Sequence, residues 1–232
     1  MPFRPPILSF ANVPLIESFV KGPSVLHIGK YYPPHRGGME THLRDLAVRQ
    51  TETARVNVVV SNSAPWQEYS VMDGVSVTRV ARLGTIASMP VCPGLMAAIR
   101  RSPADLVHIH MPNPGAALAF LMSGHPGKLI ITHHADTLGR RTLRRLSDPF
   151  VIRLMQRASR ILVTSSRYLN SSEELAPFQD KCRIVPLGID LRARRTRIAA
   201  QSNNCAVSLE IESSWRLAGS FPTKVSTSSF AP

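Results

Sequence analysis

The sequence predicts an α/β domain built on a doubly wound parallel sheet with helices on both faces. Short, nearly continuous apolar segments alternate with helical segments along residues 24–190, and strands of buried parallel sheets have this pattern. Apolar residues make up 44% of the 232 residues, which is enough for a packed core. Residues 1–23 are interpreted as an N-terminal extension, and residues 191–232 as a disordered tail.

The first part of the domain is expected to begin with a strand and to continue through a helix into further strands. Apolar residues recur at helical spacings over Gly38–Gln50, whereas β-branched residues dominate Arg55–Ser61. Asp73-Gly74 is a strong turn signal, followed by alternating valines. We therefore expect a strand at 24–29, a helix at 38–50, a strand at 55–61 and a hairpin at 69–81.

The second part repeats strands and helices in alternation. Asp148 is a favourable helix cap and Pro149 is tolerated at a first helical position, so the last helix is expected to begin there. After Asp190 the sequence turns to arginines and then to Ser, Thr and Asn without a sustained apolar period. The elements expected are a helix ending near 95–101, strands at 105–110, 128–132, 160–164 and 181–186, and helices at 115–122 and 149–158.

The chain is strongly basic, with a formal net charge of +13. Such a balance favours an anionic partner, which includes phosphorylated small molecules, anionic membrane surfaces and nucleic acid. A merely basic, soluble surface is the plain alternative. Nucleic acid is ranked last, because the sequence shows no nucleic-acid-binding motif and only 6% of its residues are aromatic.

Cysteine usage and the N-terminal segment indicate the compartment. Cys92, Cys182 and Cys205 lie far apart without CxxC spacing, which argues against a disulfide framework or a structural zinc site and favours a reducing cytosol. Prolines interrupt the apolar runs of residues 1–22, so no signal peptide is expected. No stretch approaches the roughly 20 apolar residues of a membrane span. The expectation is a cytoplasmic protein that is soluble or peripheral on the inner face of the membrane.

The loop at residues 31–40 is the first candidate site, because ligands bind at the carboxyl ends of parallel strands. Gly37 and Gly38 lack side chains, so a ligand can approach the backbone closely. The helix that follows offers unpaired N–H groups and a positive dipole end, which suits a phosphate. A tight turn explains the two glycines equally well, and no Walker lysine follows them.

Two histidine-bearing strand ends form the next candidates. His108 and His110 alternate along one strand and so share a face. Such a pair can bind a metal, but no third ligand is in evident register, so His110 is interpreted as a residue that lines the site and His108 as partly buried. At the end of the following strand, His133, His134 and Asp136 suit acid–base chemistry or contacts with sugar hydroxyls.

A cluster of arginines follows these histidines. Four of them lie within six residues, with leucines interleaved, and this pattern favours an amphipathic segment on an anionic surface. A solvated helical face is the equal alternative. The residues are Arg140, Arg141, Arg144 and Arg145.

Five segments occur in an order that resembles the N-terminal domain of glycosyltransferase family 4. They are VLHIGKYYPPHRGGMETHLRDLA (25–47), DLVHIHMPNP (105–114), ITHHAD (131–136), RILVTSSRYL (160–169) and RIVPLGID (183–190). The glycine-rich loop and the PLGID signature are specific in combination. The resemblance covers about residues 24–190 and implies one Rossmann-like half of a GT-B fold, in which two such domains face each other across a cleft.

The resemblance implies a retaining transfer of a sugar from a nucleotide-sugar, without a metal or another cofactor. It places Gly37 and Gly38 against the donor phosphate. His134 matches the active-site histidine beside the transferred sugar, and Asp136 is a neighbouring polar contact. Acceptor contacts, to a lipid or a glycan, are expected from His110, Asn113 and Glu40. Some members dock on membranes through basic surfaces of this domain, which fits the arginine cluster.

The sequence after Asp190 departs from the family pattern. The family's second domain holds the nucleotide pocket and two glutamates seven residues apart, whereas 42 residues follow Asp190 here, and Glu210 and Glu212 lack that spacing. The sequence therefore predicts an acceptor-binding half that is inactive alone and needs a separate donor domain. The alternative is a non-enzymatic basic module that binds an anionic membrane surface or a glycan.

Overall fold

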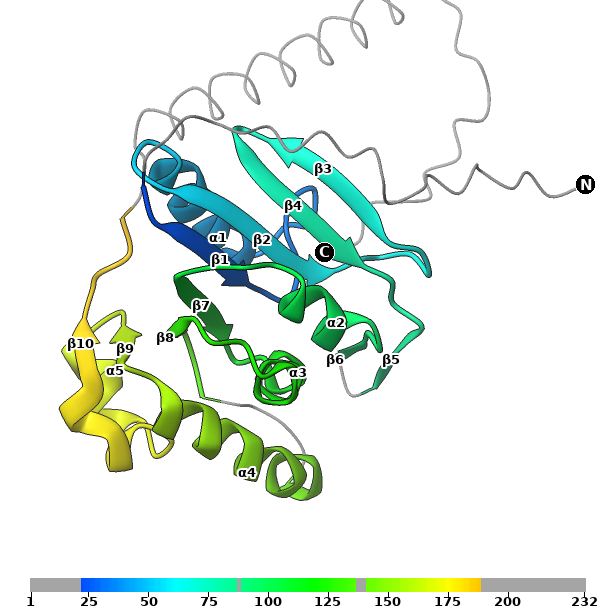
Figure 1. Cartoon of the computed structure of the whole chain (residues 1–232). Coiled ribbons are helices and arrows are strands. Elements are labelled where there is room, and N and C mark those ends of the chain that lie inside the picture. The colour runs from blue at the N-terminus through cyan, green and yellow to red at the C-terminus, as the bar shows by residue number, and fades with distance from the viewer. Residues whose placement is uncertain (1–21, 87–88, 137–140, 189–232) are drawn as a thin grey trace, which may run out of the picture. The chain divides into compact units, whose positions relative to one another are not determined.

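The computed structural model describes residues 22–86, 89–136 and 141–188, and the side chains of all of these except residues 141–146 (Figure 1). Residues 1–21 of the expected N-terminal extension and the whole of the expected tail lie outside the described residues. Among those described, no helix is long and apolar enough to cross a membrane.

An eight-stranded sheet forms the centre of the domain, in the order β10-β9-β8-β7-β1-β2-β4-β3. All neighbours pair in parallel except β3 and β4, which are antiparallel. The strands are β1 (Ser24–Ile28), β2 (Arg55–Ser61), β3 (Glu68–Met72), β4 (Val75–Val80), β7 (Leu106–Met111), β8 (Lys128–His133), β9 (Arg160–Val163) and β10 (Cys182–Ile184). A separate antiparallel pair joins β5 (Gly84–Ile86) to β6 (Met89–Val91).

Helices cover both faces of the sheet, as the sequence predicts. Strands such as β1 alternate between the two cores: Val25 packs on one face and Leu26 on the other. Helix α1 covers the first face through Leu43 and Ala47, whereas Phe120 and Leu154 contribute to the core of the second. The helices are α1 (Gly38–Gln50), α2 (Leu95–Arg100), α3 (Pro114–Ser123), α4 (Arg141–Arg157), α5 (Ser166–Ser171) and the 3₁₀ helix η2 (Ala176–Lys181).

The expected hairpin is confirmed and closes one edge of the sheet. Asp73 and Gly74 both have positive φ angles, 51° and 80°, as a two-residue turn between right-twisted strands requires. The turn joins β3 to β4 in register, with Met72 opposite Val75. The Asp-Gly signal in the sequence therefore predicts the turn, and with it the antiparallel edge strand β3.

The start predicted for the last long helix is wrong. Helix α4 begins at Arg141, and Pro149 lies inside it rather than at its first turn. An interior proline costs about 3 kcal/mol because it removes one backbone hydrogen bond and crowds the preceding turn. Val151, Leu154 and Met155 are all buried here, and each contributes about 2 kcal/mol, so their burial outweighs the defect.

The sheet order places a topological switch point between β1 and β7. These strands are neighbours, and the chain extends outward from them in opposite directions, to β2 and β4 on one side and to β8, β9 and β10 on the other. The loops after β1 and β7 therefore diverge at one edge of the sheet. Open α/β sheets bind their ligands in the crevice at such a point.

Candidate functional site

The loop between β1 and α1 is held by packing and hydrogen bonds in its first half and is exposed to solvent at its end. The Tyr32 ring is buried, the Arg79 guanidinium donates a hydrogen bond to the Pro33 carbonyl (2.7 Å), and the His35 ring is hydrogen-bonded to the Ser63 hydroxyl (2.8 Å). Residues 36–38 are exposed. The sheet thus holds the loop and leaves its glycines accessible.

Gly37 and Gly38 form the entry to α1. Gly37 is the N-cap residue, and its carbonyl accepts the first helical hydrogen bond, from the Thr41 N–H (3.0 Å). A Cβ on Gly38 would meet nothing within 4 Å, so packing inside the domain does not require glycine there. A Cβ on Gly37 would meet the Glu40 carboxylate, which is the movable end of a side chain. Both glycines are exposed at the helix end, and the Glu40 carboxylate is the group that lies against Gly37.

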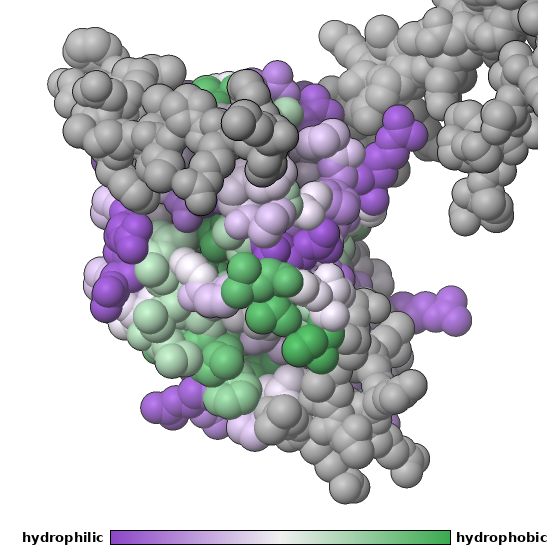
Figure 2. Space-filling model, turned by 90° about the vertical axis from the view of Figure 1, so that its right-hand side faces the viewer, coloured by the Kyte–Doolittle hydropathy of each residue, from purple (hydrophilic) through white to green (hydrophobic). Residues whose placement is uncertain are grey.

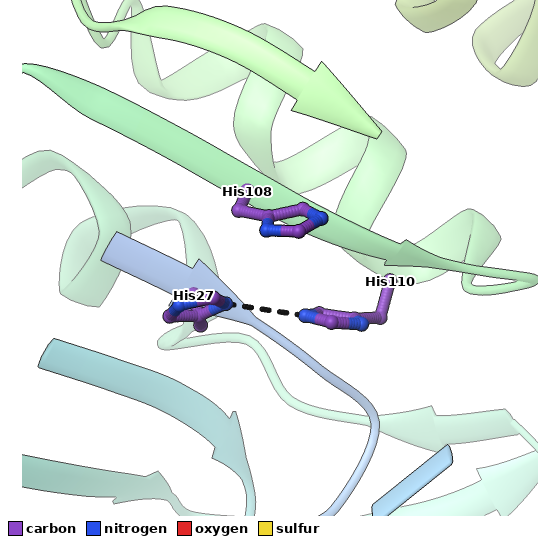
Figure 3. Close-up of side chains that lie close together, drawn as sticks. All are labelled: His27, His108 and His110. Atoms are coloured by element: carbon purple, nitrogen blue, oxygen red, sulfur yellow. Dashed lines mark hydrogen bonds between the residues drawn. The ribbon is translucent and has the colours of Figure 1, made fainter. Parts of the chain in front are cut away.

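Strand register gathers three histidines beneath α1. His27 of β1 is the register partner of His108 of β7, so both side chains point to the α1 face, and His110 lies two residues further on. Figure 3 shows the three rings side by side, with centroids 4.6–5.5 Å apart. All three are buried. The sequence alone shows no third ligand in evident register with His108 and His110, whereas the sheet brings His27 beside them.

Two further histidines extend this group to the edge of the sheet. His134 follows β8, and its ring lies 5.7 Å from that of His110. His42, from the second turn of α1, contacts both, at 5.1 Å from His134 and 5.8 Å from His110. We call His27, His42, His108, His110 and His134 the histidine cluster. It joins the loop that holds Gly37 to the end of β8.

Hydrogen bonds connect three members of the cluster in a row. The Gln50 side-chain oxygen lies 2.6 Å from Nε2 of His27, and Nδ1 of His27 lies 3.2 Å from Nε2 of His110. Nδ1 of His110 in turn lies 3.4 Å from Nε2 of His134. His108 stands beside this row and is hydrogen-bonded to the Thr132 hydroxyl (2.7 Å).

Burial keeps the cluster neutral. Desolvation lowers the pKa of His27 and of His134 to about 4, and the pKa values of His108 and His110 fall well below the usual 6.5 for the same reason. The neighbouring histidines add repulsion that acts in the same direction. At neutral pH these rings therefore offer one N–H and one lone pair each, rather than positive charge.

His133, the residue before His134, points to the opposite face and joins a different network. Its Nε2 lies 3.2 Å from the Glu174 carboxylate and its Nδ1 lies 2.8 Å from the Tyr168 hydroxyl. Tyr168 donates to the Asp136 carboxylate (2.7 Å), and the Ser172 hydroxyl donates to the same oxygen. We call His133, Asp136, Tyr168, Ser172 and Glu174 the acidic network. It ties the end of β8 and the following loop to α5.

The structure separates side chains that the sequence analysis grouped. His134 lies in the histidine cluster, whereas Asp136 bonds to α5 in the acidic network. Asn113 is buried and caps α3 by accepting a hydrogen bond from the Ala116 N–H (3.1 Å). Glu40 is partly exposed in the first turn of α1.

The arginine cluster lies largely outside the described part of the chain. Arg140 is outside the described residues. Arg141, Arg144 and Arg145 fall in α4, and their side chains are not among those described. The prediction of an anion-binding surface there stays a prediction.

His27 and His42 are the residues that the sequence analysis missed. A lone histidine in an apolar strand was a weak signal for His27, but its use required the knowledge that β1 pairs with β7. His42 shares no local pattern with the other histidines.

Three sets of described side chains have atoms close enough to hold a metal ion. They are His27 with His108 and His110, His42 with His110 and His134, and His133 with Asp136 and Glu174. In each set the atoms lie within 4.8 Å of one another. Zinc accepts such nitrogen and oxygen ligands.

Comparisons with known proteins show which family the chain is similar to. A family model described as Glycosyltransferase Family 4 matches residues 36–193. The chain is 25% identical over 171 residues to O-antigen chain mannosyltransferase C of Escherichia coli, which covers 72% of this chain and 46% of that protein. It is 30% identical over 87 residues to D-rhamnosyltransferase WbpZ of Pseudomonas aeruginosa, which covers 38% and 23%. The matched part thus spans less than half the length of these relatives.

Solved structures of two proteins resemble the described fold at low sequence identity. A sucrose-phosphate synthase from Thermosynechococcus elongatus gives a TM-score of 0.49 at 11% identity, over 73% of this chain and 49% of that one. Anabaena Alr3699/HepE in complex with UDP gives 0.45 at 17% identity, over 73% and 45%. The family assignment stands on the family model, which spans more than half of the chain and includes Gly37, Gly38 and every member of the histidine cluster except His27. The chain belongs to glycosyltransferase family 4.

Proposed function

We propose that this chain is the acceptor-side half of a retaining, nucleotide-sugar-dependent glycosyltransferase. The single observation that carries the proposal is the contact between His42 and His134, with ring centroids 5.1 Å apart. It brings the helix end that follows Gly37 and Gly38 next to the histidine at the end of β8. A phosphate-binding element and a sugar-facing side chain at one edge are what a sugar transfer from a nucleotide requires.

Each element then has a role in the proposed reaction. The N–H groups at Gly37 and Gly38 bind the donor phosphate at the positive end of α1. His134 lies beside the transferred sugar, and Asp136 holds the loop after His134 through its bonds to α5. Among the residues expected at the acceptor, Glu40 is the partly exposed one, whereas His110 and Asn113 are buried and act through their neighbours.

The donor nucleotide is proposed to bind mainly to a second domain, with no metal ion needed. The two curated relatives are named for mannose and D-rhamnose transfer, which supports a hexose or 6-deoxyhexose as the sugar. The acceptor is a lipid-linked or free glycan. The isolated chain is proposed to be inactive until a donor domain completes the cleft.

Transfer assays with the full chain test the proposal. The chain is incubated with nucleotide-linked mannose or rhamnose and a glycan acceptor, alone and with a separately expressed donor domain from a family relative. Product is expected only with the donor domain, and His134→Ala is expected to lower its rate at least tenfold.

Lys128→Ala is the matched control, since Lys128 is exposed at the opposite end of the same strand. Turnover by the chain alone at a rate comparable to a complete enzyme would refute the need for a second domain. Equal rates for His134→Ala and the control would refute the role of His134. Failure to bind any glycan acceptor would refute the acceptor-side assignment itself.

Attachment to an anionic membrane surface is the second candidate, with or without catalysis. Figure 2 shows hydrophobic residues gathered on the face that it displays, bordered by hydrophilic ones. Leu83, Ile86 and Val91, in or beside the β5–β6 hairpin, are exposed by 69%, 62% and 36%. Exposed apolar side chains on a chain of net charge +13 suit a surface of anionic lipid.

Liposome flotation separates lipid binding from general basicity. Binding to anionic vesicles and not to neutral ones is expected, and the double change Leu83→Ser, Ile86→Ser is expected to reduce it severalfold. Val71→Ser, at an exposed apolar position on the edge strand β3, is the control. Equal flotation of all three proteins would exclude the hairpin as the attachment point.

A further inference from the structure

The row of hydrogen bonds from Gln50 to His134 has a defined direction. A carboxamide oxygen can only accept, so Nε2 of His27 must donate to Gln50 across the 2.6 Å contact. A neutral imidazole carries one proton, which leaves Nδ1 of His27 as an acceptor. Nε2 of His110 must then donate to it across 3.2 Å. The same count applies to the next ring.

The proton count continues to the edge of the sheet. With its proton on Nε2, His110 presents Nδ1 as an acceptor, and Nε2 of His134 donates to it across 3.4 Å. The remaining ring nitrogen of His134 is Nδ1, which then carries a lone pair and no proton. Among the described residues this atom has no hydrogen-bond partner, and the side chain of His134 is partly exposed.

Because the rings are buried, each of them carries only one proton. His27 and His110 are 0% and 2% exposed, and no carboxylate hydrogen-bonds to either of them within the described residues. A second proton on either ring would place a positive charge in a dry site beside other histidines. Each ring is thus confined to one proton, and the position of that proton on one ring sets its position on the next.

We propose that Gln50, His27 and His110 hold His134 in the neutral tautomer protonated on Nε2, so that Nδ1 offers a lone pair to a substrate hydroxyl. Gln50, His27 and His110 are positioning residues, because they act through His134. The identity of that hydroxyl, on the sugar or the acceptor, rests on the proposed function. The tautomer itself does not.

This arrangement determines which ligand groups His134 can contact. A lone pair accepts a hydrogen bond from an O–H group and repels the oxygen of a phosphate or a carboxylate. His134 is therefore suited to a neutral sugar hydroxyl, whereas the donor phosphate is left to the N–H groups of Gly37 and Gly38. The hydrogen-bonded row thereby separates the sugar position from the phosphate position.

Nitrogen-15 NMR of the full, uniformly labelled chain at neutral pH tests the proposal directly. Long-range proton–nitrogen spectra distinguish the protonated ring nitrogen from the bare one in each histidine. His27, His110 and His134 are expected to be protonated on Nε2 and bare on Nδ1. His125 is an internal reference, because its Nδ1 accepts from the Gly127 N–H (3.0 Å) and its Nε2 donates to the Ser102 carbonyl (3.0 Å).

Two substitutions at Gln50 distinguish positioning from mere packing. Gln50→Glu puts a carboxylate against Nε2 of His27, which stabilises a second proton on that ring, so that Nδ1 of His27 donates and the tautomers of His110 and His134 are expected to reverse. Gln50→Leu removes the acceptor, and the Nδ1 resonance of His134 is expected to shift toward the value for mixed tautomers, while that of His125 stays unchanged. If Gln50→Leu does not fold, the spectrum of the unmodified chain still decides.

Three outcomes would overturn the proposal. The first is a proton on Nδ1 of His134 in the unmodified chain. The second is an unchanged His134 tautomer in a folded Gln50→Leu variant. The third is a shift of His27, His108 and His110 on addition of one equivalent of Zn²⁺, which would make these nitrogens metal ligands. None of these readings requires sugar transfer, so a failure of the proposed function leaves the tautomer test intact.

Discussion

His133 and His134 are adjacent in the chain, and the sheet sends them into opposite environments. His134 faces α1 with four other histidines, none of which is hydrogen-bonded to a carboxylate within the described residues. His133 faces the other side, between the Glu174 carboxylate and the Tyr168 hydroxyl. The comparison shows that one residue type serves two purposes. In the histidine cluster it provides directed, uncharged hydrogen bonds, and in the acidic network it provides a partner for buried negative charge.

The acidic network surrounds the His133 ring with oxygen atoms of other side chains. Tyr168 donates its hydroxyl proton to the Asp136 carboxylate, so its oxygen is left to accept from Nδ1 of His133. Nε2 faces the carboxyl group of Glu174. The ring of His133 therefore has a carboxyl partner, whereas the rings around His134 are hydrogen-bonded to neutral groups. This contrast predicts different costs when each region is disturbed.

The largest expected effect is the loss of the His133 ring. His133→Leu removes two buried hydrogen bonds, to the Glu174 carboxyl group and to the Tyr168 hydroxyl, which costs about 3 kcal/mol of folding free energy. His108→Leu, equally buried on the other face, breaks one neutral bond to Thr132 and costs about 1 kcal/mol. Urea unfolding of both variants measures the difference. Equal losses would show that the carboxyl partner of His133 makes no difference to the stability.

Acid is expected to destabilise the protein through the histidine cluster. The unfolded chain protonates its histidines near pH 6.5, whereas folded His27 has a pKa of about 4. The free energy of unfolding is therefore at its full value above about pH 6.5 and decreases as the pH falls to about 4. His27 alone accounts for a decrease of about 3 kcal/mol. Unfolding free energies across this range check the slope. His27→Phe is expected to reduce the slope of unfolding free energy against pH. An unchanged slope would show that His27 does not cause the loss of stability in acid.

The smallest expected effects come from a matched pair of hydroxyl deletions. Tyr168→Phe removes bonds to Asp136 and His133 and costs about 2 kcal/mol, since one partner is charged. Thr132→Val removes a neutral bond to His108 and costs about 1 kcal/mol. Thermal unfolding with calorimetry ranks the two. The opposite order would contradict the assignment of charge to the acidic network.

Local sequence signals account for most of the fold. The strands at β2 and β8 are apolar runs, α1 has a helical period, and the hairpin has its Asp-Gly turn, so each was predicted within a residue or two. The start of α4 was not predicted, because burial of the residues after Pro149 overrides a local preference. The short helix α5 carries too few residues to show a period.

The sequence predicts the placement of the candidate residues only where this placement depends on neighbours in the chain. The glycine loop and the end of β8 follow from the rule on carboxyl ends of strands, and the structure places both at the same edge. The hydrogen bond between His27 and His110 joins residues 83 positions apart in the sequence, and it depends on β1 lying beside β7. The separation of Asp136 from His134 depends on the position of α5 against the sheet, and the sequence of α5 does not predict that position.

The parallel register of β1 and β7 has a consequence for how this domain can change over evolution. Inserting or deleting one residue within β7 would exchange its two faces, so that Val107 or Ile109 would lie opposite His27 and the histidines would enter the apolar core. The same change in the exposed turn near Asp73 would alter the β3–β4 hairpin alone and would leave the faces of β1 and β7 in place. Tolerance of insertions and deletions should therefore be lowest in the strands that carry the histidines, and new variants of the domain should arise by lengthening its loops.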